Sequence, residues 1–272
     1  MSSQFSILDL QSIPFILHIP HSGKCIPDDV REHILLNDNQ LSHELLAMTD
    51  AFTDELFSMG ISLGGAALVN NLSRLVIDPE RYSRDEDEIM ASRGMGMVYR
   101  RTSDMQFLRN PDTYSKERQR IINRYLRSYN DAVTRLVAYQ MTKFGRCLIL
   151  DCHSFPSKPL MYELDQEIDR PEICFGTDDF LTPPEIVDSL MSLCGFYGLS
   201  YKLNKPFAGT YVPMLYSGGD KRISSVMIEV RRDLYMDEST GDRKPAFSEI
   251  KRVIDSMIEI LADYSRTMKP LL

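Results

Sequence analysis

Asp151, His153 and Ser154 directly follow a short apolar run at residues 147–150, which is typical of a buried strand. Side chains alternate along a strand, so an extended chain places Asp151 and His153 on one face and Cys152 on the other. In open α/β sheets, ligands bind beyond the carboxyl ends of the strands. A histidine beside a carboxylate at such an end suits a metal ligand with its orienting partner, or a catalytic base. The alternative is a hydrogen-bonded histidine in a loop.

The apolar run at residues 15–19 ends in a similar way. It leads into Pro20-His21-Ser22-Gly23, where proline and glycine indicate a turn. His21 stands at the carboxyl end of this run, and we predict it as a second ligand. His18 lies inside the run, and we predict it to be a hydrogen-bonded core residue.

Glu229 is the third candidate for chemistry. It lies within the apolar run at 225–230, and a carboxylate inside a buried strand is costly unless it is paired or catalytic. Arg231 and Arg232 could neutralise it. Arg231, as the neighbour on the same face, could simply be its salt-bridge partner.

Asn71, Arg74 and Arg81 follow two more apolar runs that we predict to be strands. A guanidinium group binds a carboxylate through two parallel hydrogen bonds. These residues therefore predict a receptor for an anionic substrate. The alternative is that Arg74 or Arg81 forms a structural salt bridge with Asp78.

The elements that must position these residues form an α/β pattern. Apolar residues spaced by three and four predict helices at 27–36, 38–57, 115–143, 182–196 and 247–266, and short apolar runs predict strands at 15–19, 66–69, 75–77, 147–150, 174–179, 199–203 and 225–230. Asp38 or Ser42 is the expected cap of the second helix, which carries Asp50. Gly145 ends the long helix and leads into the strand at 147, an order that implies a crossover connection and a largely parallel sheet.

Composition narrows the function classes. A chain of 272 residues with 43% hydrophobic residues can form one large domain. A net charge of −8 without a Lys/Arg block argues against a nucleic-acid partner. No apolar run approaches the roughly 18 residues of a membrane span, and the N-terminus lacks the features of a signal peptide. Five cysteines without framework spacing fit a cytoplasmic location.

Seven motifs in the chain come in the order found in N-formylglutamate amidohydrolases, and over residues 14–240 the sequence resembles that family. They are Ile19-Pro20-His21-Ser22-Gly23, Thr49-Asp50, Ser73-Arg74 through Asp78-Pro79-Glu80-Arg81, Asp151-Cys152-His153-Ser154, Gly176-Thr177-Asp178-Asp179, Pro206-Phe207-Ala208-Gly209-Thr210-Tyr211, and Ile228-Glu229 through Tyr235-Met236-Asp237-Glu238. The resemblance implies one domain over residues 1–272. Its fold would be three-layer α/β/α, with a mixed, largely parallel sheet like that of zinc carboxypeptidases.

The resemblance also implies a zinc-dependent hydrolase that cleaves the N-formyl or N-acyl amide of an acidic amino acid. His21, Asp50 and His153 would hold one zinc ion, leaving a fourth position for water. Glu229 would be the general base, and Asp151 would orient His153. The residues expected to bind the small anionic substrate are Asn71, Arg74, Arg81, Ser154, Thr210 and Tyr211.

The chain departs from the family pattern at positions expected to line the specificity pocket. Asp78-Pro79-Glu80-Arg81 stands where relatives often have Asp-Leu-Asn-Arg, Gly209-Thr210 replaces paired glycines, and Pro213-Met214-Leu215 replaces more polar residues. The sequence therefore defines the catalytic residues better than the identity of the substrate.

Two alternatives to the zinc hydrolase remain open. One is a non-catalytic homologue that binds a metal or ligand, although binding alone does not need a buried base. The other is a metal-free acyl hydrolase with Ser154 as nucleophile and His21 as base, although no Gly-x-Ser-x-Gly motif surrounds Ser154.

Overall fold

A mixed sheet of seven strands forms the middle layer of the computed structural model, which describes residues 3–9, 11–217 and 219–267. The strand order is β1-β3-β2-β4-β7-β5-β6. The strands are β1 (Phe5–Asp9), β2 (Phe15–Ile19), β3 (Ala66–Asn70), β4 (Cys147–Phe155), β5 (Ile173–Gly176), β6 (Tyr201–Leu203) and β7 (Ile223–Arg231). The four central strands, β3, β2, β4 and β7, are parallel, whereas β1 and β5 run antiparallel to their central neighbours. The predicted mixed, largely parallel sheet is confirmed.

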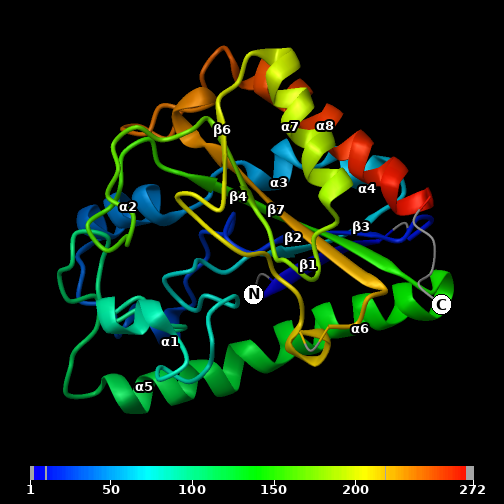
Figure 1. Cartoon of the computed structure of the whole chain (residues 1–272). Helices are drawn as coiled ribbons and strands as arrows, with labels where there is room; N and C mark the ends of the chain where they lie inside the picture. Colours follow the sequence, from blue (N-terminus) through cyan, green and yellow to red (C-terminus); the bar gives the residue numbers. More distant parts are fainter. Residues whose placement is uncertain (1–2, 10, 218, 268–272) are drawn as a thin grey trace.

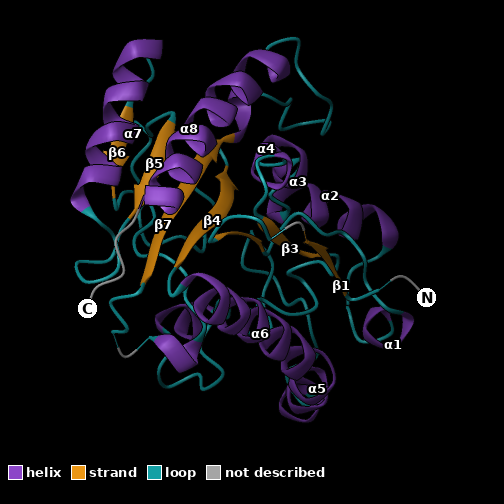
Figure 2. Ribbon diagram, turned by 90° about the vertical axis from the view of Figure 1, so that its right-hand side faces the viewer, coloured by secondary structure: helices purple, strands orange, loops and turns teal. Residues whose placement is uncertain are grey.

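Helices cover both faces of the sheet, which gives the predicted three layers (Figures 1 and 2). One face carries α3 (Thr53–Leu56), α4 (Met59–Ser62), α7 (Pro184–Tyr197) and α8 (Phe247–Thr267). The other carries a long helical rod made of α5 (Tyr114–Ile121), a π-helical turn η2 (Ile122–Leu126) and α6 (Arg127–Phe144). Gly145, with φ of 71°, ends this rod as expected. No helix in the described ranges is long and apolar enough to cross a membrane.

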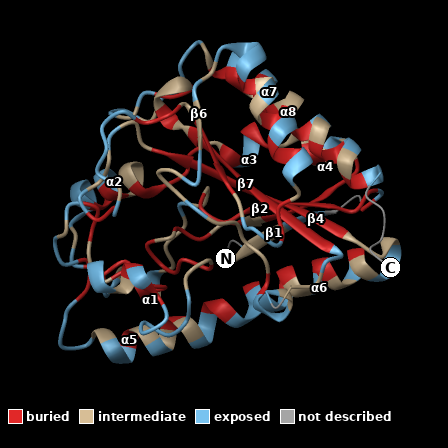
Figure 3. Ribbon diagram, in the orientation of Figure 1, coloured by how far each residue is buried: buried red, intermediate tan, exposed pale blue. Residues whose placement is uncertain are grey.

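Strand β4 divides its side chains between the two faces. Leu148, Leu150 and Cys152 belong to the core cluster that includes α7 and α8, whereas Cys147 and Ile149 pack in the cluster of α6. All nine residues of β4 are buried, and Figure 3 shows the central strands buried along their length. Asp151 and His153 therefore share the α6 face, and Cys152 points away from them, as predicted.

The prediction of a strand at 75–77 was wrong, and so was the predicted end of the strand that begins at Cys147. Residues 75–77 form a turn rather than a strand, and they are apolar because they pack in a separate core cluster with α2 (Asp38–Met48). The edge position beside β3 is taken instead by β1, which the sequence did not reveal. Strand β4 does not end at Leu150 but continues to Phe155, because it pairs with β7 along its whole length.

The predicted helix at 38–57 is broken, and the break places Asp50. Helix α2 ends at Met48, Thr49 is extended (φ −79°, ψ 134°), and Phe52 has φ of 67° before α3 begins. Within the break, the Asp50 N–H donates to the His21 carbonyl over 3.0 Å, and the Thr53 hydroxyl donates to the Asp50 carbonyl over 2.9 Å. Asp50 thus lies in a turn held against the end of β2, not on a helix.

Asn37 caps α2, so the expected caps Asp38 and Ser42 were wrong. The Asn37 side chain accepts from the Gln40 N–H, and the Gln40 side chain accepts from the Asn37 N–H, each over 3.0 Å. We expect Asn37→Ala to lower the free energy of unfolding by about 1 kcal/mol. Thermal unfolding should show a midpoint lowered by about 2–4 °C. Asn39→Ala, at an exposed position inside the same helix, is the control, and an equal loss there would contradict a capping role.

Candidate active site

Three ligand atoms converge at the carboxyl edge of the sheet. His21 Nδ1 lies 3.2 Å from His153 Nδ1, and Asp50 Oδ2 lies 3.2 Å from His153 Nδ1 and 3.7 Å from His21 Nδ1. Ligands bound at about 2.0–2.1 Å in a tetrahedral zinc site lie about 3.3 Å from one another. The three residues are between 1% and 4% exposed. Their spacing and donor types fit the predicted metal centre.

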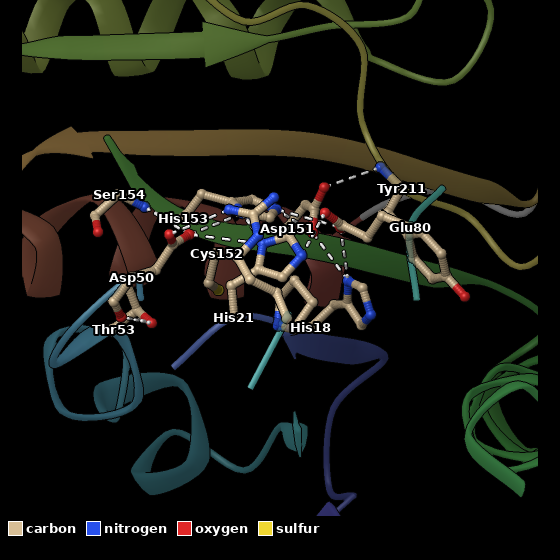
Figure 4. A network of polar contacts seen from close by, with 12 residues as sticks. His18, His21, Asp50, Thr53, Glu80, Asp151, Cys152, His153, Ser154 and Tyr211 are labelled. Atoms are coloured by element: carbon tan, nitrogen blue, oxygen red, sulfur yellow. Dashed lines mark hydrogen bonds and ion pairs between the residues drawn. The ribbon is translucent and has the colours of Figure 1, made fainter. Parts of the chain in front are cut away.

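The opposite ring nitrogens of both histidines lie beside carboxylates, and Figure 4 shows His153 beside Asp151 and Glu80. His21 Nε2 lies 2.9 Å from Asp78 Oδ1, and His153 Nε2 lies 3.0 Å from Asp151 Oδ1 and 3.2 Å from Glu80 Oε1. A neutral histidine that binds a metal through Nδ1 carries its proton on Nε2 and donates it to such a partner. These carboxylates therefore select the tautomer that leaves both Nδ1 atoms available.

Asp151 links the metal centre to the segment expected to cover the substrate. Its Oδ1 also lies 2.9 Å from His18 Nδ1, and its Oδ2 accepts from the Tyr211 N–H over 3.1 Å. His18 is fully buried, and its other nitrogen lies 2.8 Å from the Tyr129 hydroxyl, so the predicted core histidine is confirmed. The Tyr211 ring stacks on His18 with centroids 4.0 Å apart.

The surroundings of the three ligand atoms favour positive charge. Burial alone would lower the pKa of His153, but the Glu80 and Asp151 carboxylates raise it well above its usual value. Burial would raise the pKa of Asp50, but hydrogen bonds from His153 and His21 and the charge of Arg232 hold it well below its usual range. A divalent cation held by these three atoms would supply this positive charge.

Arg232 holds Asp50 in place, a role that we did not predict. Its Nη2 donates to Asp50 Oδ1 over 2.8 Å and its Nη1 donates to the Ala47 carbonyl over 2.6 Å. The side chain is buried, and it follows β7 directly in the short helix η4 (Arg232–Leu234). With Oδ1 bound to Arg232, Asp50 presents Oδ2 to the two histidines. The sequence offered only one sign of this role, the position of Arg232 three residues after Glu229.

Glu229 lies beside the metal centre. It is the register partner of His153 on the neighbouring parallel strand, so the two side chains emerge on the same face. Burial raises the pKa of Glu229 to about 8. Its Oε2 is buried and accepts no hydrogen bond from the residues that the structure describes. Arg231 pairs instead with Asp233 over 2.7 Å, so it is not the salt-bridge partner of Glu229.

A cavity of about 840 Å³ opens over this edge of the sheet. Its wall includes both histidine ligands and Glu229. Of the residues expected to bind substrate, it includes Arg74, Arg81, Thr210 and Tyr211. The cavity thus joins the candidate metal centre, a buried carboxylate and two guanidinium groups.

The family model described as N-formylglutamate amidohydrolase matches residues 13–236 of the chain. The chain belongs to the N-formylglutamate amidohydrolase family. It is 24% identical to N-formylglutamate deformylase of Pseudomonas aeruginosa over 262 residues, which cover 93% of this chain and 94% of that protein.

One solved structure agrees with this assignment, and a second shares the fold. The crystal structure of N-formylglutamate amidohydrolase from Ralstonia eutropha JMP134 superposes with a TM-score of 0.81 and 26% identity, covering 97% of this chain and 98% of that one. A gene product of Agrobacterium tumefaciens has the same fold, with a TM-score of 0.71 and 16% identity over 96% of both chains.

In this family member, Arg74 and Arg81 differ in the hydrogen bonds that their guanidinium groups form with neighbouring residues. Arg74 Nη2 donates to Asp78 Oδ2 and its Nε donates to the Tyr99 hydroxyl, each over 2.8 Å, which is the structural salt bridge left open above. Arg81 Nε is 3.7 Å from Asp78 Oδ2, its Nη1 is 3.5 Å from Glu88 Oε1, and its Nε makes no hydrogen bond within the described ranges. Arg81 is therefore better placed to bind a substrate carboxylate, while Arg74 also supports Asp78 behind His21.

The structure does not bring Asn71 and Ser154 to the cavity of this amidohydrolase-family chain. The Asn71 side chain donates to the Ser3 carbonyl and the Ser6 hydroxyl over 2.9 and 3.1 Å, so it fastens the segment around β1. Ser154 follows His153 along β4, so its side chain points to the opposite face of the sheet. There its hydroxyl accepts from Arg232 Nε over 3.2 Å. Sequence proximity to a motif suggested both residues, whereas strand alternation and packing against β1 direct them elsewhere.

Proposed function

We propose that this protein is a zinc-dependent amidohydrolase that cleaves the N-formyl or N-acyl amide of an acidic amino acid, with N-formylglutamate as the reference substrate. The observation that carries the proposal is the unpaired Glu229 carboxylate beside the convergent Nδ1 atoms of His21 and His153 and Oδ2 of Asp50. Its relatives named N-formylglutamate deformylase and N-formylglutamate amidohydrolase support the substrate class. We further propose that the whole chain, 1–272, works as one catalytic domain.

His21, Asp50 and His153 would hold the ion, and Asp78, Asp151 and Arg232 would keep these ligands oriented. When bound there, zinc supplies Lewis acidity to the scissile carbonyl and lowers the pKa of water to about 7. Two histidines and one carboxylate are a ligand set of catalytic zinc sites, which keep one position open.

Glu229 supplies the proton transfers. Its free Oε2 accepts a proton from the attacking water and then returns it to the amide nitrogen as the C–N bond breaks. A carboxylate whose pKa burial has raised is a stronger base than an exposed one, which suits this task. The products are the free amino acid and the carboxylic acid, formate in the case of a formyl amide.

The two alternative functions have less support. In the described part of the chain no hydrogen bond joins Ser154 to His21, so a Ser154 nucleophile would lack its base. A binding protein without turnover would have no use for the unpaired Glu229, whose burial as a carboxylate costs free energy.

We also propose that the protein lies in the reducing cytoplasm. Free thiols at the buried Cys147, Cys152 and Cys174 support this location.

The test is to purify the protein without a histidine tag, measure its metal content and assay N-formyl-L-glutamate hydrolysis. We expect one zinc ion per chain and release of glutamate that stops after chelation and returns with zinc. A zinc-loaded protein that cleaves neither this substrate nor any other N-acyl amino acid would refute the proposed function.

Replacing Arg81 tests recognition of the acidic amino acid. Arg81→Lys keeps the charge but removes the planar fork that binds a carboxylate through two hydrogen bonds. We expect KM for N-formyl-L-glutamate to rise by about tenfold, because about one charge-assisted hydrogen bond is lost. The change in kcat should be smaller. Arg84→Lys, at an exposed arginine in the same loop that does not line the cavity, is the control. An unchanged KM in Arg81→Lys would show that another group binds the carboxylate.

A further inference from the structure

The cavity has an apolar side that the proposed reaction centre does not use. Leu181, Val212, Met214, Leu215 and Met227 all line it. Met227 precedes Glu229 by two residues and lies on the same face of β7, so the apolar wall begins beside the base. The segment at 210–211 is fixed above this strand, since the Thr210 and Ser225 hydroxyls lie 2.7 Å apart and the Ser225 hydroxyl lies 2.8 Å from the Tyr211 carbonyl.

Met227 and the arginines lie on opposite sides of the candidate metal centre. Arg74 and Arg81 contact Asp78, which in turn holds His21 at the end of β2. Met227 belongs to β7, and the order β3-β2-β4-β7 puts β4 with His153 between them. An amino acid whose carboxylate binds the arginines therefore directs its acyl group towards β7.

Three carboxylates that line the cavity already have partners. Asp178 Oδ1 accepts from the Phe180 and Leu181 N–H groups, Asp165 accepts from the Glu167 N–H, and Glu163 pairs with the buried Arg170. These carboxylates are therefore already engaged, and the wall formed by Leu181, Val212, Met214, Leu215 and Met227 is apolar.

Met214 and Leu215 are 68% and 73% exposed although they line the cavity. They lie on the short helix η3 (Met214–Tyr216), whose third residue, Tyr216, packs against the core beside α6. Two large apolar side chains held outward at the mouth of a site are unfavourable in water and mark a surface for an apolar ligand. The cavity volume of about 840 Å³ is also near the upper end of the 300–1,000 Å³ range of pockets that bind drug-sized ligands. A formyl amino acid is smaller than such ligands.

We infer that the preferred substrates carry an unbranched apolar acyl group longer than formyl. This acyl group lies between Met227 and the Met214–Tyr216 helix. This inference rests on the proposed amidohydrolase function and narrows its substrate class to N-alkanoyl acidic amino acids. Burying one methylene strengthens binding by about fourfold. Partial exposure at the mouth reduces this gain, so hexanoyl should exceed acetyl by about tenfold or more in kcat/KM.

The experiment measures kcat/KM of the zinc-loaded enzyme for acetyl, butanoyl, hexanoyl and octanoyl derivatives of L-glutamate, with N-formyl-L-glutamate assayed in parallel. The comparison starts at acetyl because formyl amides are intrinsically more reactive. We expect kcat/KM to rise from acetyl to hexanoyl. A flat or falling series, with N-formyl-L-glutamate cleaved, would overturn the acyl pocket and leave the proposed function intact.

Substitutions locate the effect. The double variant Met214→Ser, Leu215→Ser should reduce the ratio of hexanoyl to acetyl kcat/KM by about tenfold, whereas Phe196→Ser, which changes a residue 81% exposed on α7, should leave the ratio unchanged. Equal ratios in the double variant and the parent would place the acyl group elsewhere and overturn the inference.

A binding measurement keeps the inference testable if no amide is cleaved, the outcome that refutes the proposed function. Calorimetric titration of zinc-loaded Glu229→Gln protein with the same series should show dissociation constants that fall with chain length. Constants that do not change with chain length would overturn the acyl pocket.

Discussion

Glu229→Gln should lower kcat for amide hydrolysis by about 10²- to 10⁴-fold, the usual contribution of general acid–base catalysis. Glutamine keeps the shape of the side chain but cannot accept and return a proton through Oε2. Because the Glu229 carboxylate is not paired with Arg231, its replacement does not leave the Arg231 cation without a partner. Metal content and KM should therefore stay close to those of the parent, and steady-state kinetics with elemental analysis will separate the three quantities.

Glu44→Gln is a matched control for the loss of a buried carboxylate. Glu44 is 4% exposed, burial raises its pKa, it accepts from the Ser103 N–H and hydroxyl, and it does not line the cavity. Its replacement should affect stability but not kcat. If Glu229→Gln retains more than about a tenth of parental kcat, a different group moves the proton and the assignment of Glu229 as base is wrong.

His153→Ala should abolish both metal binding and hydrolysis. It removes one of three ligand atoms and leaves the Asp151 carboxylate with one imidazole partner, His18, instead of two. A bound ion stabilises the native state by mass action, so chelation should lower the unfolding midpoint of the parent. The same chelator should have no effect on the midpoint of His153→Ala, and elemental analysis should find no zinc in this variant.

His43→Ala provides the comparison for His153→Ala. His43 lies exposed on α2, so its loss should change neither metal content nor the response to chelation. Full zinc occupancy in His153→Ala would remove this residue from the ligand set. It would then point to one of the other groups of carboxylates and histidines at this edge, such as His21 with Asp78 and Glu80.

The sequence predicted the parts of the site that depend on strand periodicity. Alternation placed Asp151 and His153 on one face and Cys152 on the other, and a polar residue after an apolar run located His21 at a strand end. A charged residue within an apolar run identified Glu229 as unusual. These inferences held because strand geometry is local.

The parts that depend on tertiary contacts were not predictable in the same way. Asp50 is close to the histidines because a helix breaks at Thr49, and neither glycine nor proline signals that break. Arg232 contacts Asp50 across 182 residues of sequence, a separation that no local pattern reports. The run at 75–77 was read as a strand because burial alone makes a short segment apolar, whichever backbone conformation it adopts.

The pairing of His153 with Glu229 across β4 and β7 has a consequence for heat inactivation. The two residues are one step apart on a parallel ladder, about 4.8 Å, and this spacing is maintained by backbone hydrogen bonds along nine residue pairs. Amide protons in such a central ladder usually exchange with solvent only when the whole domain unfolds. Opening of the surrounding loops can therefore release a substrate or the ion, but it cannot separate these two residues, and they should part only in the global transition.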